Sequence, residues 1–123
     1  QVLLARVGLG AQQGVRAASL AHGARRQLEL AMTLALRPKL MLLDEPMAGM
    51  SQKESADMVQ LLQQLRGRQA MVLVEHDMDA VFALADRITV LVYGRPVATG
   101  TPGEIRDNPE VRGAYLGDEE EIL

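Results

Sequence analysis

The chain has 123 residues, 48% of them hydrophobic and 24% charged, and its formal net charge is −3 at pH 7. These values are typical of one globular domain, exclude a disordered segment, and argue against a nucleic-acid-binding protein. Because the sequence contains no cysteine, it excludes disulfides and thiolate metal sites, and no apolar run approaches the roughly 20 residues of a membrane-spanning helix.

The N-terminal region, residues 1–19, is rich in glycine and small residues, and at most it is consistent with the end of a helical segment. A helix is predicted to follow from Gly23 to Leu36, and Pro38 stops it. Its predicted buried stripe has helical spacing and consists of Leu28, Ala31, Met32 and Ala35. Free backbone N–H groups at the helix start could bind a phosphate, which a glycine lets approach closely. By spacing alone, a plain turn before a helix is the simpler interpretation.

The next feature is an apolar run, Leu40 to Leu43, that leads directly into Asp44, Glu45 and Pro46. The run predicts a strand buried on both faces, and Pro46 ends it because proline cannot donate to a sheet. The two carboxylates then lie at the carboxyl end of a strand, where open α/β sheets bind ligands. They suit Mg²⁺ ligation and activation of a water for phosphoryl transfer. A strand that ends in a solvated acidic turn explains the same residues.

A second helix is predicted after the short connection of residues 47–50. Ser51 and Glu54 have the spacing of a capping box at its start. Its apolar stripe is assigned to the core and consists of Met58, Leu61, Leu62 and Leu65. A glycine between two arginines, residues 66–68, ends the helix.

A second buried strand, residues 70–74, ends in Glu75, His76 and Asp77. The strand–helix–strand order makes parallel pairing the default, so His76 is expected at the same sheet edge as the two carboxylates. A lone histidine after a strand is more often structural, and Asp77 is predicted to cap the next helix.

The C-terminal part is predicted to form a hairpin and short helices. Residues 88–93 are a third strand, and residues 96–99 return as an antiparallel edge strand. Thr101 and Asn108 precede helix starts that carry proline at the first position, and Gly117 ends the last helix. The acidic residues 118–121 are expected to be a solvated tail.

Three features stand in order along the chain: a glycine at a helix start, an apolar strand that ends in Asp-Glu, and a strand followed by histidine. In this order and spacing, they together resemble the second half of an ABC-type ATPase domain. The segment that resembles the ABC signature consists of Leu20, Ala21, His22, Gly23 and Ala24. Leu40 to Glu45 resembles the Walker B strand, and His76 the switch histidine. The segment that resembles the D-loop consists of Ala48, Gly49, Met50 and Ser51. The sequence around these positions looks most like the ATP-binding subunits of branched-chain amino acid ABC transporters.

The resemblance implies an α/β fold: a partial P-loop NTPase-type sheet of mostly parallel strands with flanking helices, then a C-terminal hairpin and short helices. It divides the chain into three parts. Residues 1–22 end a helical subdomain, residues 23–101 form the Walker B and switch core, and residues 102–123 form the C-terminal helices and tail.

The resemblance also implies roles for single residues, with ATP and Mg²⁺ as ligands. Glu45 polarises the attacking water, His76 contacts the γ-phosphate, and Asp44 holds Mg²⁺. The signature-like segment caps the γ-phosphate of ATP on a second ATP-binding subunit in a head-to-tail dimer.

Some residues depart from the family pattern. Ala21, His22 and Ala24 stand where the general signature has serine, glycine and glutamine, and Ser51 replaces the D-loop aspartate. A phosphate-cradling Gly-x4-Gly-Lys-Ser/Thr motif is absent. We therefore expect that motif upstream of Gln1, which makes this chain the C-terminal half of an ATPase.

The implied function of the parent protein is hydrolysis of MgATP to import branched-chain or related amino acids. Its implied partners are a second ATP-binding subunit, transmembrane permease subunits and, indirectly, a solute-binding protein, with no nucleic acid. Its implied location is cytoplasmic, on the inner face of the membrane. By itself, the chain is expected to be inactive and to self-associate. The alternatives are an ABC ATPase outside transport and an inert interaction module.

Overall fold

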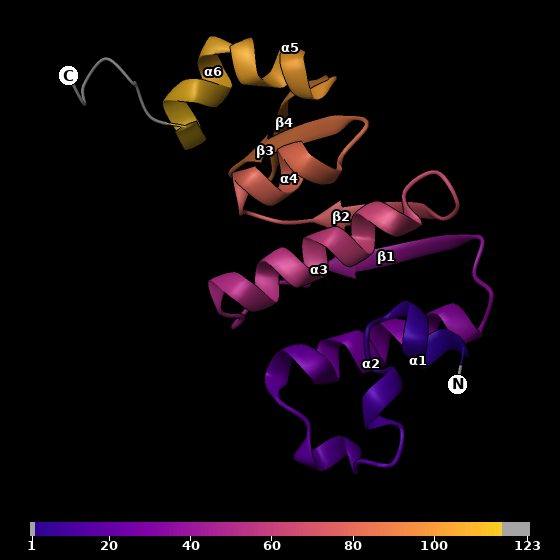
Figure 1. The fold of residues 1–123 in the computed structure, drawn as a ribbon. Coiled ribbons are helices and arrows are strands. Elements are labelled where there is room, and N and C mark those ends of the chain that lie inside the picture. The colour runs from indigo at the N-terminus through magenta and orange to yellow at the C-terminus, as the bar shows by residue number, and fades with distance from the viewer. Residues whose placement is uncertain (1, 117–123) are drawn as a thin grey trace. The chain divides into compact units, whose positions relative to one another are not determined.

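The structure, a computed structural model, describes residues 2–116 of the chain. The chain forms two compact units, Gln1–Glu75 and His76–Leu123 (Figure 1). The predicted helix end at Gly117 and the predicted acidic tail of residues 118–121 lie outside the described residues. The predicted division at residues 22 and 101 follows sequence motifs and stays a prediction.

The first unit combines helices with a two-stranded sheet. Its helices are α1 (Val2–Arg6), α2 (His22–Ala35) and α3 (Gln52–Leu65), and its strands are β1 (Leu40–Asp44) and β2 (Ala70–Val74). Short 3-10 turns at Gly10–Gln12 and Ala17–Ser19 connect α1 to α2. Helix α1 forms although the sequence pattern there is weak, and Val7 and Leu9 directly after it are buried. These two apolar side chains anchor the segment, and tertiary burial of this kind overrides weak local propensity.

Strands β1 and β2 pair in parallel, with Leu40 opposite Ala70 and Asp44 opposite Val74. The sequence predicts strands buried on both faces, and this is wrong for the chain as described. Met41 is 1% exposed, whereas its neighbour Leu42 is 74% exposed. The other exposed apolar side chains in the same alternation are Leu40, Val72 and Val74. Because successive strand residues face opposite sides, one sheet face is buried and the other is open.

Helices α2 and α3 differ in how well their buried faces were predictable. The predicted stripe of α3 is confirmed, since all four of its residues are buried: Met58, Leu61, Leu62 and Leu65. The predicted stripe of α2 is confirmed only at Ala31, because Met32 is 63% exposed and the other buried apolar residues are Leu30 and Leu34. Most polar residues of α2 share one face, and the apolar residues cover a wide arc opposite it. The helical period therefore does not decide which part of that arc is buried.

The second unit combines a hairpin with short helices. It contains α4 (Met78–Leu84), β3 (Ile88–Val92), β4 (Arg95–Gly100), α5 (Pro102–Asp107), α6 (Pro109–Val111) and a π-helical turn at Arg112–Leu116. The predicted antiparallel pairing of β3 and β4 is confirmed, with a bulge between Val90 and Leu91. The core of this unit consists of Ile88, Val90, Ile105 and Val111. With a parallel pair in one unit, an antiparallel pair in the other and helices in both, the predicted α/β class is confirmed.

Candidate functional site

The carboxyl end of β1 places Asp44 and Glu45 side by side at a sharp change of chain direction. Asp44 is the last residue of the strand and is exposed. The Glu45 N–H donates to the Val74 carbonyl oxygen at 2.7 Å, which extends the ladder with β2 by one bond. Glu45 then has a φ of +46°, in the left-handed region that residues with a side chain rarely adopt and that clusters at functional sites. The sheet therefore holds the backbone on one side of Glu45, and buried Pro46 follows on the other.

The carboxylates at this edge are too few to form an all-protein metal site. Among residues 2–116, no group of three or more histidine, cysteine, aspartate or glutamate side chains could hold a metal ion. Mg²⁺ usually keeps several waters and binds through one or two carboxylates plus substrate phosphates. An exposed carboxylate such as that of Asp44 fits this mode and does not fit an all-protein metal cage.

The connection from β1 to α3 is a compact double turn. The Ala48 N–H donates to the Glu45 carbonyl at 3.0 Å, and the Met50 N–H donates to the Met47 carbonyl at 3.1 Å. Gly49 has a φ of +75°, and a Cβ placed on it would stand 3.3 Å from the Nε2 of His22. Both the backbone conformation and the space beside the imidazole therefore favour glycine at this position.

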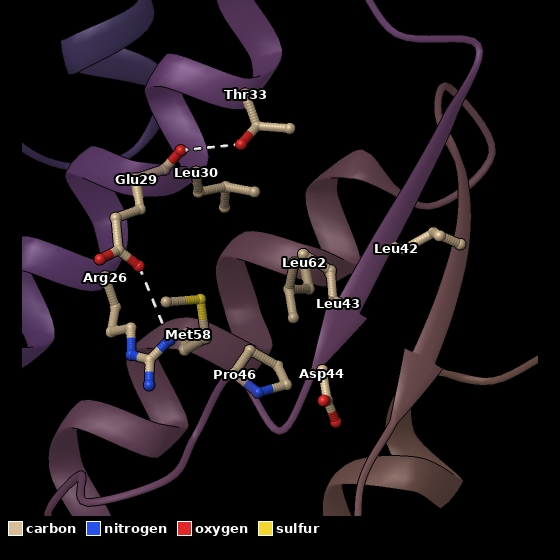
Figure 2. A pocket seen from close by; sticks show the side chains of 10 residues that line it. All are labelled: Arg26, Glu29, Leu30, Thr33, Leu42, Leu43, Asp44, Pro46, Met58 and Leu62. Carbon is tan, nitrogen blue, oxygen red and sulfur yellow. Dashed lines mark hydrogen bonds and ion pairs between the residues drawn. The ribbon is translucent and has the colours of Figure 1, made fainter.

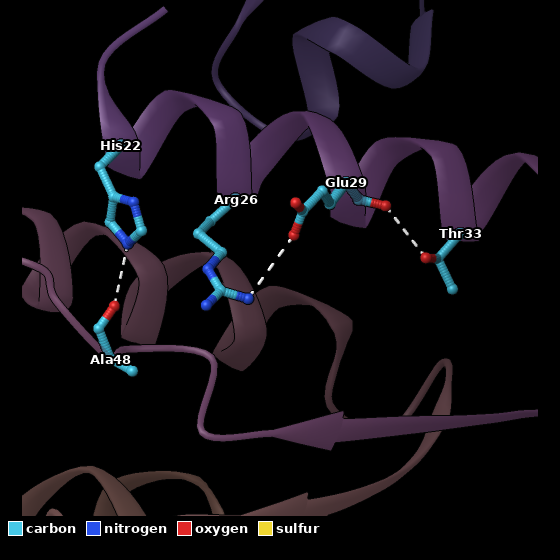
Figure 3. Close-up of polar contacts among 5 residues, drawn as sticks. All are labelled: His22, Arg26, Glu29, Thr33 and Ala48. Carbon is cyan, nitrogen blue, oxygen red and sulfur yellow. Dashed lines mark hydrogen bonds and ion pairs between the residues drawn. The ribbon is translucent and has the colours of Figure 1, made fainter.

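His22 joins the start of α2 to this connection, as Figure 3 shows. Its Nε2 lies 2.9 Å from the Ala48 carbonyl oxygen. A carbonyl oxygen only accepts hydrogen bonds, so the imidazole must donate through Nε2. The D-loop-like segment and the signature-like segment are thus in direct contact within one chain, which the sequence did not predict.

Glu54 makes a second link between the same two segments. The predicted capping box is confirmed: the Ser51 side chain accepts from the Glu54 N–H, and Glu54 Oε1 accepts from the Ser51 N–H at 3.4 Å. A Cβ on buried Gly23 would stand only 2.1 Å from the other oxygen, Oε2. The carboxylate therefore lies directly against the Gly23 backbone at the start of α2.

The pKa of Glu54 reflects these contacts. Hydrogen bonds from the Ser51 backbone and hydroxyl lower the pKa of its carboxyl from the ordinary 4.5, partial desolvation opposes them, and the Gly23 backbone and His22 lower it further. Sequence reasoning assigned Glu54 only to the cap of its own helix. The signal that it missed lies in α2, whose N-cap is Ala21 and whose first turn carries no acidic residue.

A pocket of about 200 Å³ lies between α2, β1 and α3 (Figure 2). Its lining is polar along α2 and mostly apolar elsewhere, and it consists of Arg26, Glu29, Leu30, Thr33, Leu42, Leu43, Asp44, Pro46, Met58 and Leu62. Arg26 Nη1 pairs with Glu29 Oε2 at 3.6 Å, and Thr33 Oγ1 donates to the Glu29 carbonyl at 3.0 Å. The side chains of Arg26 and Glu29 are therefore paired with each other, and the Thr33 hydroxyl is bonded to the helix backbone.

His76 is the first residue of the second unit and is exposed, directly before Asp77. The prediction that Asp77 caps the following helix is confirmed, since its side chain accepts from the Ala80 N–H. His76 and Glu45 belong to different units, so the expectation that they share one sheet edge stays a prediction.

Within residues 2–116, none of the helices has the length and apolar character of a membrane span.

Comparison with known proteins gives the family. A family model described as "ABC transporter" matches residues 1–48, and one described as "Branched-chain amino acid ATP-binding cassette transporter" matches residues 95–121. The chain is 43% identical over 117 residues to the high-affinity branched-chain amino acid transport ATP-binding protein LivG of Salmonella typhimurium, covering 94% of this chain and 46% of LivG. It is 45% identical over 104 residues to BraF of Pseudomonas aeruginosa, a protein of the same description, covering 83% and 41%.

A solved structure of an ABC transporter component shares the fold. The structure of MJ1267 in its ADP conformation, an ATP-binding cassette of an ABC transporter, matches with a TM-score of 0.81 at 24% identity, covering 95% of this chain and 48% of that one. This likeness confirms the predicted P-loop NTPase-type fold. The chain spans about half the length of the curated relatives that it matches. On the sequence matches and the fold together, the chain belongs to the family of ABC transporter ATP-binding domains.

Proposed function

We propose that the protein containing this chain is the ATP-hydrolysing subunit of an ABC importer for branched-chain or related amino acids. The names and identities of LivG and BraF support this substrate class. The structural observation that carries the proposal is the end of β1, where Asp44 and Glu45 follow the last paired residues and Glu45 has a left-handed backbone.

In the proposed mechanism, Glu45 orients and polarises the water that attacks the γ-phosphate. A carboxylate held next to a fixed backbone turn suits this role, because catalysis of phosphoryl transfer depends mainly on positioning and electrostatics. His76 would contact the γ-phosphate and stabilise its developing charge. Asp44 would hold Mg²⁺, which when bound neutralises charge on the phosphates.

The signature-like segment would act on a second subunit. Its N–H groups at the start of α2, with the positive end of the helix dipole, favour an anion such as a γ-phosphate. Buried Gly23 has the small size that a close backbone approach requires. The proposed partners are therefore a second ATP-binding subunit and, in an importer, permease subunits and a solute-binding protein. Association with permeases would place the protein on the inner face of the membrane.

Uptake by living cells tests the proposal. The gene is deleted in the source organism, and uptake of labelled leucine, isoleucine and valine is compared with uptake of an unrelated sugar. We expect loss of amino acid uptake only, restored by the wild-type gene and not by a Glu45→Gln gene. Unchanged uptake of all three amino acids in the deletion strain would contradict the proposed substrate class.

A further inference from the structure

The start of α2 lacks a cap of its own. Helices α3, α4, α5 and α6 each have an N-cap side chain that accepts from a backbone N–H of the first turn, namely Ser51, Asp77, Thr101 and Asn108. Helix α2 begins after Ala21, which cannot accept, and its first turn carries no acid. Because the first N–H groups of a helix have no partner within it, α2 needs an acceptor from elsewhere.

The carboxylate of Glu54 supplies that acceptor from α3. Glu54 is half-buried, and its Oε2 lies so close to Gly23 that a Cβ there would stand at 2.1 Å. Hydrogen bonds from Ser51 are the main cause of the lowered pKa of Glu54, and the Gly23 backbone and His22 lower it further. A negative carboxylate at the positive end of α2 is the favourable arrangement for the helix dipole.

His22 makes a second contact, from α2 to the connection after β1. Its Nε2 donates to the Ala48 carbonyl oxygen at 2.9 Å (Figure 3). Gly49 leaves room for the imidazole. His22 of α2 thus contacts the connection after β1, and Glu54 of α3 contacts the start of α2.

We propose that Glu54 and His22 are positioning residues that clamp the signature-like segment, residues 20–24, to the D-loop-like segment, residues 48–51, so that the two move together. The mechanistic part of this inference rests on the proposed function. An anion that binds at the start of α2 must compete with or shift the Glu54 carboxylate, and Glu54 also holds the Ser51 N–H. Binding of an anion at Gly23 is thereby coupled to the position of the loop from Glu45 to Ser51.

The chain offers a matched control for the clamp. In α5, Glu104 also belongs to a cap: its N–H donates to Thr101 Oγ1 at 3.3 Å, and a Cβ on Gly100 would stand 2.9 Å from Glu104 Oε2. Its partners are the residues just before it in the chain. Glu104→Ala therefore removes a capping glutamate without touching either motif segment, whereas Glu54→Ala removes the cap and the clamp.

The first test is hydrogen exchange of the intact protein without nucleotide. In Glu54→Ala, we expect the amides of residues 23–25 and 48–50 to exchange roughly tenfold faster or more, because a charge-assisted contact is lost. Glu104→Ala should change exchange only around residues 102–105. His22→Phe keeps a ring of similar bulk and removes the donor, and it should speed exchange at residues 48–50. Unchanged exchange at 48–50 in both Glu54→Ala and His22→Phe would overturn the clamp.

The second test is steady-state ATP hydrolysis. Glu54→Ala should lower kcat about tenfold with KM for ATP within about twofold, because misplacement affects the reacting geometry more than nucleotide capture. Glu54→Gln keeps an acceptor oxygen and should restore at least about half of kcat. Equal kcat in Glu54→Ala and Glu104→Ala would overturn the proposed coupling between the start of α2 and the loop after β1. A wild-type protein without ATPase activity would refute the proposed function, while hydrogen exchange would still decide on the clamp.

Discussion

The carboxylate of Glu54 at the start of α3 lies against the backbone of Gly23 at the start of α2, where an added Cβ would meet Glu54 Oε2 at 2.1 Å. Two helix starts that are far apart in the sequence therefore share one acidic side chain. This relationship explains why Gly23 is buried and why α2 can begin after an alanine. It also gives the first prediction.

Gly23→Ala should destabilise the intact protein only when Glu54 is present. With Glu54, the new methyl group displaces the carboxylate and removes its hydrogen bonds. In a Glu54→Ala background the methyl group has room, and alanine should then stabilise the helix by roughly 0.5–1 kcal/mol relative to glycine. A double-mutant cycle by urea unfolding measures this reversal of sign. Equal destabilisation in both backgrounds would contradict the packing of Glu54 on Gly23.

The second prediction concerns pH. The contacts of Glu54 lower the pKa of its carboxyl below the ordinary 4.5, with the Ser51 backbone as the largest cause. A group whose folded pKa is depressed stabilises the fold above the unfolded pKa, and this stabilisation is lost as pH falls through the folded pKa. Wild type should therefore exceed Glu54→Gln in unfolding free energy at neutral pH, and the difference should shrink below about pH 4.5. A difference that grows on acidification would contradict this assignment.

The third prediction concerns the open face of the β1–β2 sheet. Leu42 is 74% exposed, and Leu40, Val72 and Val74 are each at least half exposed. Exposed apolar patches and open strand edges favour association, so the 123-residue chain should form dimers or larger oligomers on its own. Light scattering over a dilution series measures this. A Leu42→Glu variant should dissociate at higher concentration than wild type, and Thr89→Glu, at an exposed position of β3, is its control. A wild-type monomer at tens of micromolar with a cooperative melt would contradict the prediction.

The fourth prediction concerns His76. If its side chain contacts the γ-phosphate, His76→Ala in the intact protein should lower ATP turnover while the affinity for ADP stays within about twofold, because ADP lacks that group. Calorimetric titration with ADP and steady-state kinetics with ATP give the two quantities. An equal loss of ADP affinity would assign His76 a structural role instead.

Local chemistry made part of this structure predictable. The caps at Ser51, Asp77, Thr101 and Asn108 were predictable because each involves residues within three positions of the cap. The end of β1 before Glu45 was predictable because Pro46 cannot continue a ladder. The carboxylates at that strand end therefore followed from the sequence.

Contacts between distant segments were not predictable in the same way. The buried face of α2 depends on which neighbours pack against it, and Met32 lies outside that face. Burial of the strands depends on whether a second layer is present, and alternate side chains such as Leu42 remain exposed. The link from Glu54 to Gly23 needs a tertiary contact, since within its own helix Glu54 already completes a capping box.

The most direct test of the proposed mechanism is ATP hydrolysis by the intact protein with Glu45→Gln. The amide keeps the shape of the side chain and removes the negative oxygen that polarises water. We predict that kcat falls by roughly two orders of magnitude or more while ATP binding survives, and that the control Glu104→Gln keeps wild-type turnover. Turnover close to wild type in Glu45→Gln would contradict the assignment of Glu45 to the chemical step.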